Sequence, residues 1–344
     1  MAVRVSPLES GGHPAWDDFV CKHPRGTAFH LLAWKRTIQS VFGFMPQYLA
    51  AFDGPTLVGV LPLFEVWNPF MGKVLISSPF AVYGGILASS DESRSMLAQA
   101  AADLARNLQV QHLELRNAFS DQNAGFLPLK RYVTFTKQVE AADGEALLQK
   151  LPKKTRNLVR KALKHPFSVR ITRDYRNFER LYSKNLRRLG TPSFPPRLFS
   201  KLIENFGQYV DVREILLDDR IVAASFNFIF RGEMHTYYAA ADYDFIQFAP
   251  NMFLYYNHLL WAGQNGVHTF DFGRSKQNTG TADFKAQWDP SMRELPYEIL
   301  LVKRKELPNF SPVNPKFSLP IAVWQKLPLP LTRALGPHLV KFFP

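Results

Sequence analysis

The sequence predicts the same order of secondary structure in its two halves, and this repeat limits the possible folds more than any other feature. In the first half, the turn pair Asp53-Gly54 joins two apolar runs into a β-hairpin, and a strand, a helix and two further strands follow. In the second half, a turn at 218–220 joins two apolar runs, and a strand, a helix and two strands follow again. We therefore expect two similar α/β units with mixed sheets. The expected strands and helices lie at 48–52, 57–65, 74–77, 96–108, 112–116 and 132–139, and then at 210–217, 221–230, 234–240, 250–265, 269–272, 281–287 and 295–302.

The length of 344 residues fits two domains, because single domains usually contain about 100–200 residues. We expect an N-terminal domain at 1–145, a C-terminal domain with the active site at 146–307, and a tail rich in proline and aromatic residues at 308–344. The join between the domains is placed at Ala141-Ala142-Asp143-Gly144.

The composition excludes several classes of protein. No apolar run approaches the ~18 residues that suggest a membrane span, and residues 1–20 lack the apolar region of a signal peptide. Cys21 is the single cysteine, so no intrachain disulfide can form, and a cytoplasmic location is expected. The nine histidines lack metal-ligand spacing, and we expect no metal. The net charge of +13 points to an anionic partner: nucleic acid, a phosphate-bearing substrate or a lipid surface.

Much of the positive charge lies in one predicted helix after Pro152. Arg156, Arg160 and Lys164 are four residues apart and therefore share one face of this helix. The face is either an ordinary solvated surface or a phosphate-binding one, which Arg suits through its planar, bidentate guanidinium. The same helix makes an RNA-binding protein one alternative function.

The tail at 308–344 combines eight prolines with aromatic and basic side chains, among them Trp324, Phe342 and Phe343. Short amphipathic pieces of this kind either wrap around a domain or lie on a membrane surface. Both readings stay open from the sequence.

The densest polar cluster follows the predicted helix of the second half. It reads Phe-Asp-Phe-Gly-Arg-Ser-Lys at 270–276, and the pattern Asp-Phe-Lys-x-x-Trp follows at 283–288. Ligands of open α/β sheets bind beyond the carboxyl ends of the strands, where Asp271 and Arg274 are expected. Gly273 allows a ligand or the backbone to approach closely.

These two motifs, with the Thr-Gly pair at 279–280 between them, resemble the C-terminal signature of FemAB-like proteins, which are tandem-GNAT N-acyltransferases. The nearest subgroup in this resemblance is associated with exosortase/PEP-CTERM systems. The likeness extends over nearly the whole chain. It includes His-Leu-Leu-Ala-Trp at 30–34, Val-Gly-Val-Leu-Pro-Leu at 58–63, the basic helix from 151, Ala-Pro-Asn at 249–251 and the tail at 324–337.

The resemblance implies two tandem GNAT-like domains and transfer of an acyl or aminoacyl group to an amine. The donor would be an aminoacyl-tRNA or an acyl thioester, and the acceptor a cell-envelope precursor, of peptidoglycan or of an exopolysaccharide. If the tail lies on a membrane surface, as its residues allow, the contact would be peripheral and at the inner face of the membrane. A non-catalytic scaffold with the same fold is another alternative.

The resemblance also assigns roles to single residues. Lys285 matches the lysine of the family's Phe-Lys motif and is expected to contact the oxyanion or the donor phosphate, the alternative being a structural ion pair with Asp271 or Asp283. Asp271 would orient Arg274 or accept a proton from the amine. The expected substrate-binding residues are Tyr237, Tyr238, Asn251, Ser275, Lys276, Asp283, Trp288, Arg156 and Arg160.

One stretch departs from GNAT proteins that use acetyl-CoA. Those proteins have a glycine-rich loop after the third strand, whose N–H groups hold the pyrophosphate. Here the stretch at 241–249 contains no glycine and two aspartates. Standard binding of coenzyme A is therefore not expected.

Overall fold

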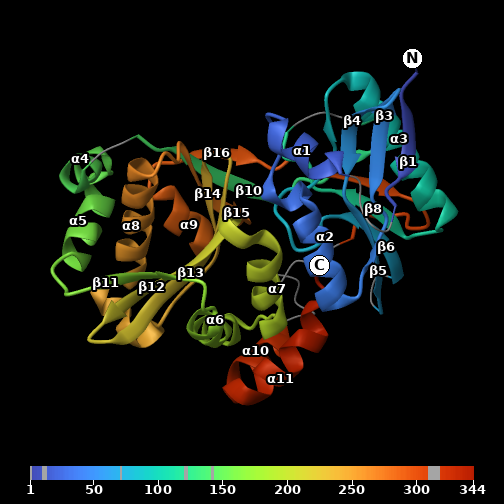
Figure 1. Cartoon of the computed structure of the whole chain (residues 1–344). Helices are drawn as coiled ribbons and strands as arrows, with labels where there is room; N and C mark the ends of the chain where they lie inside the picture. The colour runs from blue at the N-terminus through green and yellow to red at the C-terminus, as the bar shows by residue number, and fades with distance from the viewer. Residues whose placement is uncertain (1, 10–13, 70–71, 120–122, 141–142, 309–317) are drawn as a thin grey trace. The chain divides into compact units, whose positions relative to one another are not determined.

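A computed structural model describes residues 2–9, 14–69, 72–119, 123–140, 143–308 and 318–344 (Figure 1). The chain forms two compact units, and both are discontinuous in sequence. Unit 1 contains Met1–Arg131, Glu294–Phe310 and Lys341–Pro344, and unit 2 contains Tyr132–Arg293 and Ser311–Val340. The expected domain limits, 1–145, 146–307 and 308–344, stay a prediction, and Ala141 and Ala142 of the expected join lie outside the described residues.

Unit 1 has two sheets. The strand order of the smaller sheet is β1-β3-β4-β7, and that of the larger is β2-β5-β6-β8-β17-β9. Pro62 separates β4 from β5, so the single strand expected at 57–65 is instead two strands in different sheets. Proline cannot donate a ladder hydrogen bond, which explains the break. The elements are β1 (Arg4–Pro7), α1 (Ala15–Lys22), η1 (Ala28–His30), α2 (Leu32–Phe42), β2 (Met45–Pro46), β3 (Leu49–Asp53), β4 (Thr56–Leu61), β5 (Leu63–Asn68), β6 (Gly72–Ser77), β7 (Leu87–Ala88), α3 (Asp91–Asn107), β8 (His112–Leu115), β9 (Leu127–Pro128) and β17 (Glu298–Leu301).

Unit 2 has one sheet, with strand order β11-β12-β13-β14-β15-β10-β16. Helices α5 and α8 cover one face of this sheet, and α6 and α7 cover the other (Figure 1). The predicted mixed α/β class is confirmed. The elements are β10 (Val133–Gln138), α4 (Gly144–Lys150), α5 (Lys153–Ala162), β11 (Ser168–Thr172), α6 (Arg176–Leu189), α7 (Pro196–Phe206), η2 (Gly207–Tyr209), β12 (Val210–Leu217), β13 (Arg220–Phe230), β14 (Glu233–Ala241), η3 (Tyr243–Phe248), α8 (Pro250–Gln264), β15 (Thr269–Ser275), α9 (Gly280–Ala286), β16 (Ser291–Glu294), α10 (Ser318–Lys326) and α11 (Leu329–Val340).

Both units contain the same central motif. In unit 1, β6 and β8 are parallel neighbours joined through α3, and in unit 2, β14 and β15 are parallel neighbours joined through α8. In each case the second strand of the pair has an antiparallel neighbour on its other side, β17 beside β8 and β10 beside β15.

These antiparallel neighbours come from the opposite half of the chain. The sequence placed 132–139 with the first half and 295–302 with the second, but β10 belongs to the sheet of unit 2 and β17 to that of unit 1. The expectation was wrong because apolar alternation identifies a strand without identifying its partner. Each half therefore contributes one strand to the other unit.

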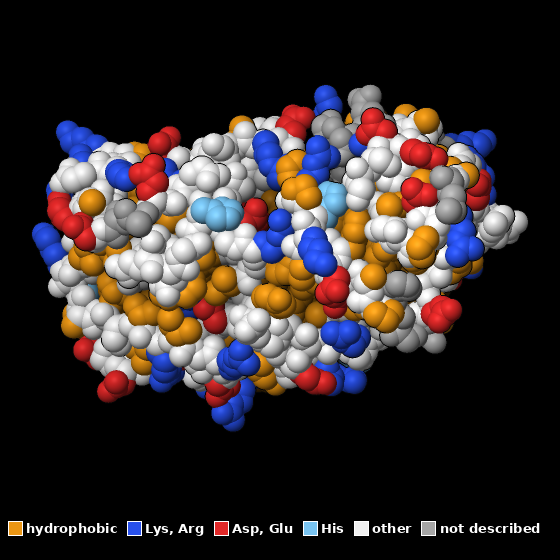
Figure 2. Space-filling model, turned by 45° about the horizontal axis from the view of Figure 1, so that its top comes forward, with side chains coloured by type: hydrophobic (Ala, Val, Ile, Leu, Met, Phe, Trp, Pro, Cys, Tyr) orange, Lys and Arg blue, Asp and Glu red, His pale blue; other side chains and the backbone are white. Residues whose placement is uncertain are grey.

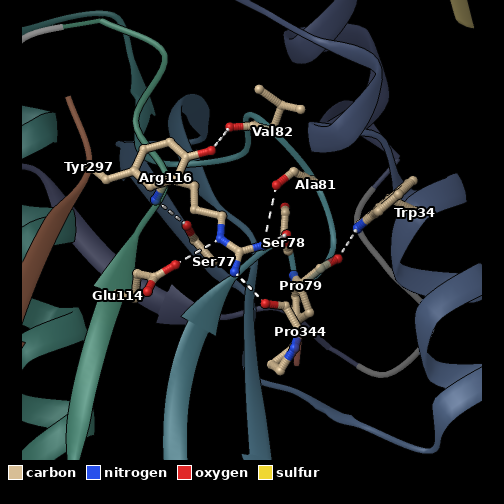
Figure 3. A network of polar contacts seen from close by, with 10 residues as sticks. All are labelled: Trp34, Ser77, Ser78, Pro79, Ala81, Val82, Glu114, Arg116, Tyr297 and Pro344. Carbon is tan, nitrogen blue, oxygen red and sulfur yellow. Dashed lines mark hydrogen bonds and ion pairs between the residues drawn. The ribbon is translucent and has the colours of Figure 1, made fainter. Parts of the chain in front are cut away.

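The carboxyl end of the parallel pair in unit 1 is occupied by Arg116 (Figure 3). Its Nε donates to Glu114 Oε1 at 2.9 Å, and its two Nη atoms donate to the carbonyl oxygens of Ala81 at 3.2 Å and Pro344 at 2.7 Å. The residue is only 4% exposed. Burial raises the pKa of Glu114, but the charge and the hydrogen bond of Arg116, together with the smaller effects of His112 and Arg131, hold the pKa below its usual value.

We predict that Arg116→Met destabilises the protein by about 3–5 kcal/mol, because it leaves Glu114 as a buried charge without its guanidinium. The loss should shrink as the pH falls through about 4.5, the ordinary pKa of Glu, because Glu114 is protonated first in the folded variant, where burial raises its pKa, then in the unfolded chain and last in the wild type. Chemical denaturation of the variant and the wild type at neutral and acid pH measures both effects. Arg106→Met is the control, since this exposed arginine pairs with the exposed Asp103. Equal stability of the two variants would contradict the prediction.

Candidate active site in unit 2

The central strands of unit 2 separate and leave a cavity between them. Strand β14 pairs with β15 only where Glu233–His235 face Thr269–Asp271, although both strands continue beyond this point. A cavity of about 770 Å³ opens where the strands separate. Its walls come from six elements and the turns that flank them, and one of these elements is η3 with Tyr243 and Ile246. They include Tyr182, Asn185, Leu186, Arg188 and Leu189 of α6, Thr236 to Ala241 of β14, Asn251 and Tyr255 of α8, Phe272, Arg274 and Ser275 of β15, and Thr279, Gly280, Thr281, Phe284 and Lys285 in or beside α9.

A β-bulge turns two successive tyrosines towards this cavity. Phe226 of β13 faces Tyr238 of β14, but the next residue, Asn227, faces Thr236, so the register between the two strands shifts by one residue. Tyr237 is the extra residue. Successive side chains on a regular strand point to opposite faces, but a bulge interrupts this alternation. Tyr237 and Tyr238 therefore both line the cavity, and their expected role in substrate binding stays a prediction.

A second bulge lies on the other wall, where β15 pairs with β10. Thr134 faces Arg274 and Thr136 faces Asp271, so β15 has an extra residue between them. Gly273 lies in this bulge with φ +77°, a conformation that favours glycine. A side chain there would also approach His235 Nε2, at 3.0 Å from the Cβ position. The sequence expected the strand to end at Gly273, but β15 continues through the bulge to Ser275.

Lys285 is fixed on this bulge. Its Nζ donates to the carbonyl oxygens of Gly273 at 2.8 Å and Arg274 at 2.9 Å. An ammonium group has three N–H donors, so one remains for a further acceptor. Burial lowers the pKa of Lys285 to about 8, an effect that Asp271 opposes and Arg274 reinforces.

The charged side chains of the cavity wall are all cationic. Arg188, Arg274 and Lys285 line it, and no aspartate or glutamate appears among the described lining residues. The guanidinium of Arg274 stacks over the ring of Tyr132 with its Cζ 4.7 Å from the centroid. Such a cavity favours a ligand that carries negative charge or develops it during a reaction. No group of three His, Cys, Asp or Glu side chains within the described residues could hold a metal ion.

Asp271 lies beneath the cavity rather than in its wall. It is 3% exposed, and its Oδ1 accepts hydrogen bonds from Gly273 N at 2.6 Å and from Thr134 Oγ1 at 3.3 Å. The other oxygen, Oδ2, is 3.9 Å from Nδ1 of the buried His235. We expected Asp271 to share the pocket with Lys285 and Arg274, but its side chain instead holds the bulge that carries them.

The other predicted residues divide into two groups. Asn251 and Ser275 line the cavity together with the tyrosines. Trp288 is fully buried against the rings of Tyr255, Phe272 and Phe284, and so supports the wall from behind. The remaining predicted residues, Lys276, Asp283, Arg156 and Arg160, are not among the lining residues.

The basic helix expected to bind phosphate is α5. Arg156 Nη1 donates to Gln149 Oε1 at 3.0 Å, and Arg160 Nη2 lies 3.1 Å from Glu145 Oε1. Both partners belong to the neighbouring helix α4. These contacts fit the solvated-face interpretation of α5, and a ligand role for it stays a prediction.

Sequence reasoning missed the wall that α6 provides. Tyr182, Asn185, Arg188 and Leu189 were not among the expected site residues. The available signal was the run from 176 to 189, which alternates charged and apolar residues at helical spacing and ends at Gly190, an αL C-cap. The spacing indicates a helix, but it does not say that the helix borders a cavity.

We predict that Gly273→Ala lowers stability by about 1–2 kcal/mol, because it combines an unfavourable positive φ with a close contact to His235. Gly280→Ala is the control, since its added Cβ would meet no atom within 4 Å. Chemical denaturation of both variants measures the difference. A Gly273→Ala variant as stable as the control would show that the bulge does not depend on glycine.

Comparisons with known proteins agree with this geometry. Residues 149–286 match the family model described as an acetyltransferase (GNAT) domain. No curated protein matches the sequence. Among solved structures, the crystal structure of FemX matches with a TM-score of 0.68 and 14% identity over 87% of this chain and 98% of that one. A tandem GNAT protein from the clavulanic acid biosynthesis pathway matches with a TM-score of 0.53 and 10% identity over 88% of this chain and 100% of that one.

A third structure is the C-terminal domain of a putative lysylphosphatidylglycerol synthetase from Agrobacterium fabrum, with a TM-score of 0.57 and 12% identity over 83% of this chain and 90% of that one. The resemblance seen in the sequence motifs is thus confirmed for a GNAT domain at 149–286 and for a fold like that of tandem GNAT proteins, while its exosortase/PEP-CTERM subgroup stays a prediction. Residues 149–286, in unit 2, match a GNAT domain, and the chain as a whole shares its fold with FemX and with a tandem GNAT protein.

Proposed function

We propose that this protein transfers an acyl or aminoacyl group from an activated donor to an amine, with the reaction in the cavity of unit 2. The observation that carries the proposal is the cationic wall of this cavity, with Lys285 held where β14 and β15 separate. Attack of an amine on an ester or thioester carbonyl gives a tetrahedral intermediate with a negative oxygen. A fixed cation near that oxygen lowers the barrier in a site from which water is largely excluded.

Lys285 is the residue we assign to this oxyanion or to a phosphate of the donor. Its two hydrogen bonds to main-chain carbonyls fix the position of Nζ and leave one donor for the ligand. Arg274 adds a second cation on the same wall. Asp271 acts as a positioning residue, because it binds Gly273 N and so supports the bulge that holds Lys285.

A cavity with a cationic wall suits a donor whose carrier group is an anion, and both candidate donors have such a carrier. Aminoacyl-tRNA and an acyl thioester of coenzyme A each bring phosphates to three cationic side chains. The segment after β14 does not form the glycine-rich loop of acetyl-CoA enzymes. Instead, its two aspartates pair with Lys184 of α6, whose Nζ lies 2.6 Å from Asp242 Oδ1 and 2.8 Å from Asp244 Oδ2. A donor that does not need the glycine-rich loop fits this segment better, and we therefore favour aminoacyl-tRNA.

The acceptor is proposed to be an amine of a cell-envelope precursor. FemX and the putative lysylphosphatidylglycerol synthetase share the fold, and the name of the latter denotes an aminoacylated lipid. A cytoplasmic location, an exopolysaccharide acceptor and the PEP-CTERM context come from the resemblance of the motifs. No described helix has the length and apolar character to cross a bilayer.

We predict that Lys285→Met lowers kcat/KM for transfer by roughly a hundredfold, because it removes one charge from the oxyanion site and keeps most of the side-chain volume. Labelled aminoacyl-tRNA and labelled acetyl-CoA, each supplied with a panel of amines, provide the assay. Lys161→Met, an exposed lysine of α5 outside the cavity, is the control. A scaffold protein would show no transfer in the wild type, and an RNA-binding protein would retain salt-sensitive tRNA binding without product.

The pH dependence of transfer distinguishes two roles for Lys285. A cation at the oxyanion must be protonated, so we expect the contribution of Lys285 to kcat/KM to fall as the pH rises through about 8, the pKa of Lys285. The acceptor amine must be neutral to attack, and its ionisation affects the wild type and Lys285→Arg equally, so the two profiles are compared as a ratio. Because arginine does not lose its proton, the ratio of wild type to Lys285→Arg should fall through about pH 8. A ratio that rises through pH 8 would contradict the cationic role and assign the neutral amine of Lys285 as a general base.

A further inference from the structure

The tail helices α10 and α11 leave one apolar face uncovered. Leu319 is 73% exposed and Val323 is 52% exposed on α10, while Leu331 and Leu335 are 42% exposed and Leu339 is 38% exposed on α11. The three α11 leucines are four residues apart and form one line about 12 Å long at 1.5 Å per residue. We call these five side chains the tail stripe.

The opposite face of the same helices is firmly packed on α6, beside which Figure 1 shows them in red. The buried Trp324 donates from Nε1 to the carbonyl oxygen of Thr191 at 3.2 Å. Arg333 lies 2.5 Å from the buried Glu179 of α6, and Ser193 Oγ donates to the carbonyl oxygen of Thr332 at 3.3 Å. The inner face of the tail therefore packs on unit 2, as the wrapping interpretation of the sequence predicted for Trp324. The tail stripe faces outward.

The charge of the tail is one-sided. No aspartate or glutamate occurs from 307 to 344, whereas Lys326, Arg333, His338 and Lys341 lie in the described part of this segment. Arg333 forms an ion pair with Glu179, but Lys326 and His338 are exposed next to the stripe. Elsewhere the surface is mixed: on the face drawn in Figure 2, Lys and Arg side chains lie among Asp and Glu. An apolar stripe with a basic border that lacks any acid matches the interface of an anionic bilayer.

We propose that the tail stripe binds the surface of an anionic membrane, with its leucines inserted at the level of the headgroups. A second copy of the chain fits this surface less well. A symmetric dimer would place the same basic border against itself, and like charges would repel across the interface. The stripe is also too short to span the bilayer and suits shallow insertion of about 5–10 Å. This inference concerns the tail surface alone and does not depend on the proposed transfer reaction.

Cosedimentation of the full chain with vesicles tests the proposal. We expect the wild type to bind vesicles of phosphatidylcholine mixed with phosphatidylglycerol more tightly than vesicles of phosphatidylcholine alone, and less tightly as salt is raised. The double variant Leu331→Gln/Leu335→Gln should bind about tenfold more weakly, because two partly exposed leucines no longer enter the bilayer. Val169→Gln/Ile171→Gln is the matched control, since these side chains on β11 are 40% and 51% exposed and lie outside the tail.

Thermal unfolding of each variant without lipid shows whether the fold is intact, and the surface position of all four residues predicts nearly unchanged melting temperatures. The proposal is overturned if the wild type does not bind the mixed vesicles, or if the leucine variant binds as tightly as the control. It is also overturned if light scattering shows a wild-type dimer that the leucine variant converts to a monomer, with no lipid binding by either protein.

Discussion

The separation of β14 from β15 is the constraint on which the candidate site depends. Two parallel strands that continued in register would fill the sheet with main-chain hydrogen bonds and leave no room for a ligand. Here the ladder stops after His235 faces Asp271, and the cavity begins at the next residues. Every group assigned a role in the proposed chemistry lies at or next to this point. The cavity is thus produced by backbone geometry, and the side chains only define its charge.

The two bulges on either side of the cavity give the candidate site its arrangement of side chains. The bulge at Tyr237 brings two neighbouring rings to one side of β14, and the bulge at Gly273 exposes carbonyl groups to which Lys285 binds. Asp271 is buried so that it can accept the amide hydrogen of Gly273, and its charge also opposes the loss of the proton from Lys285. A small local distortion therefore fixes the position and influences the protonation of the central lysine at the same time.

The two units have the same parallel motif but use its carboxyl end differently. In unit 1, the guanidinium of Arg116 occupies that place and binds Glu114 together with main-chain carbonyls (Figure 3). In unit 2, Lys285 reaches the strand end from a following helix and the space in front of it is open. A buried arginine satisfied by several acceptors favours a structural role, whereas a lysine with a lowered pKa at a cavity favours a functional one. Because of this contrast, we assign the chemistry to unit 2 alone, although both units contain the motif.

The sequence by itself determined the local elements and the motif that matters most. Asp53-Gly54 identified the first hairpin and Pro250 the start of α8, because turn residues, caps and apolar periodicity act over a few residues. The run around Gly273 and Lys285 identified the candidate site. The tertiary structure alone decided which strands became partners, so that β10 and β17 are exchanged between the units. It also buried Asp271 below the cavity, placed α6 along its wall, and left the tail stripe uncovered. These outcomes depend on contacts between residues far apart in the chain, and a hydrophobic pattern records that a face is buried or exposed without recording against what.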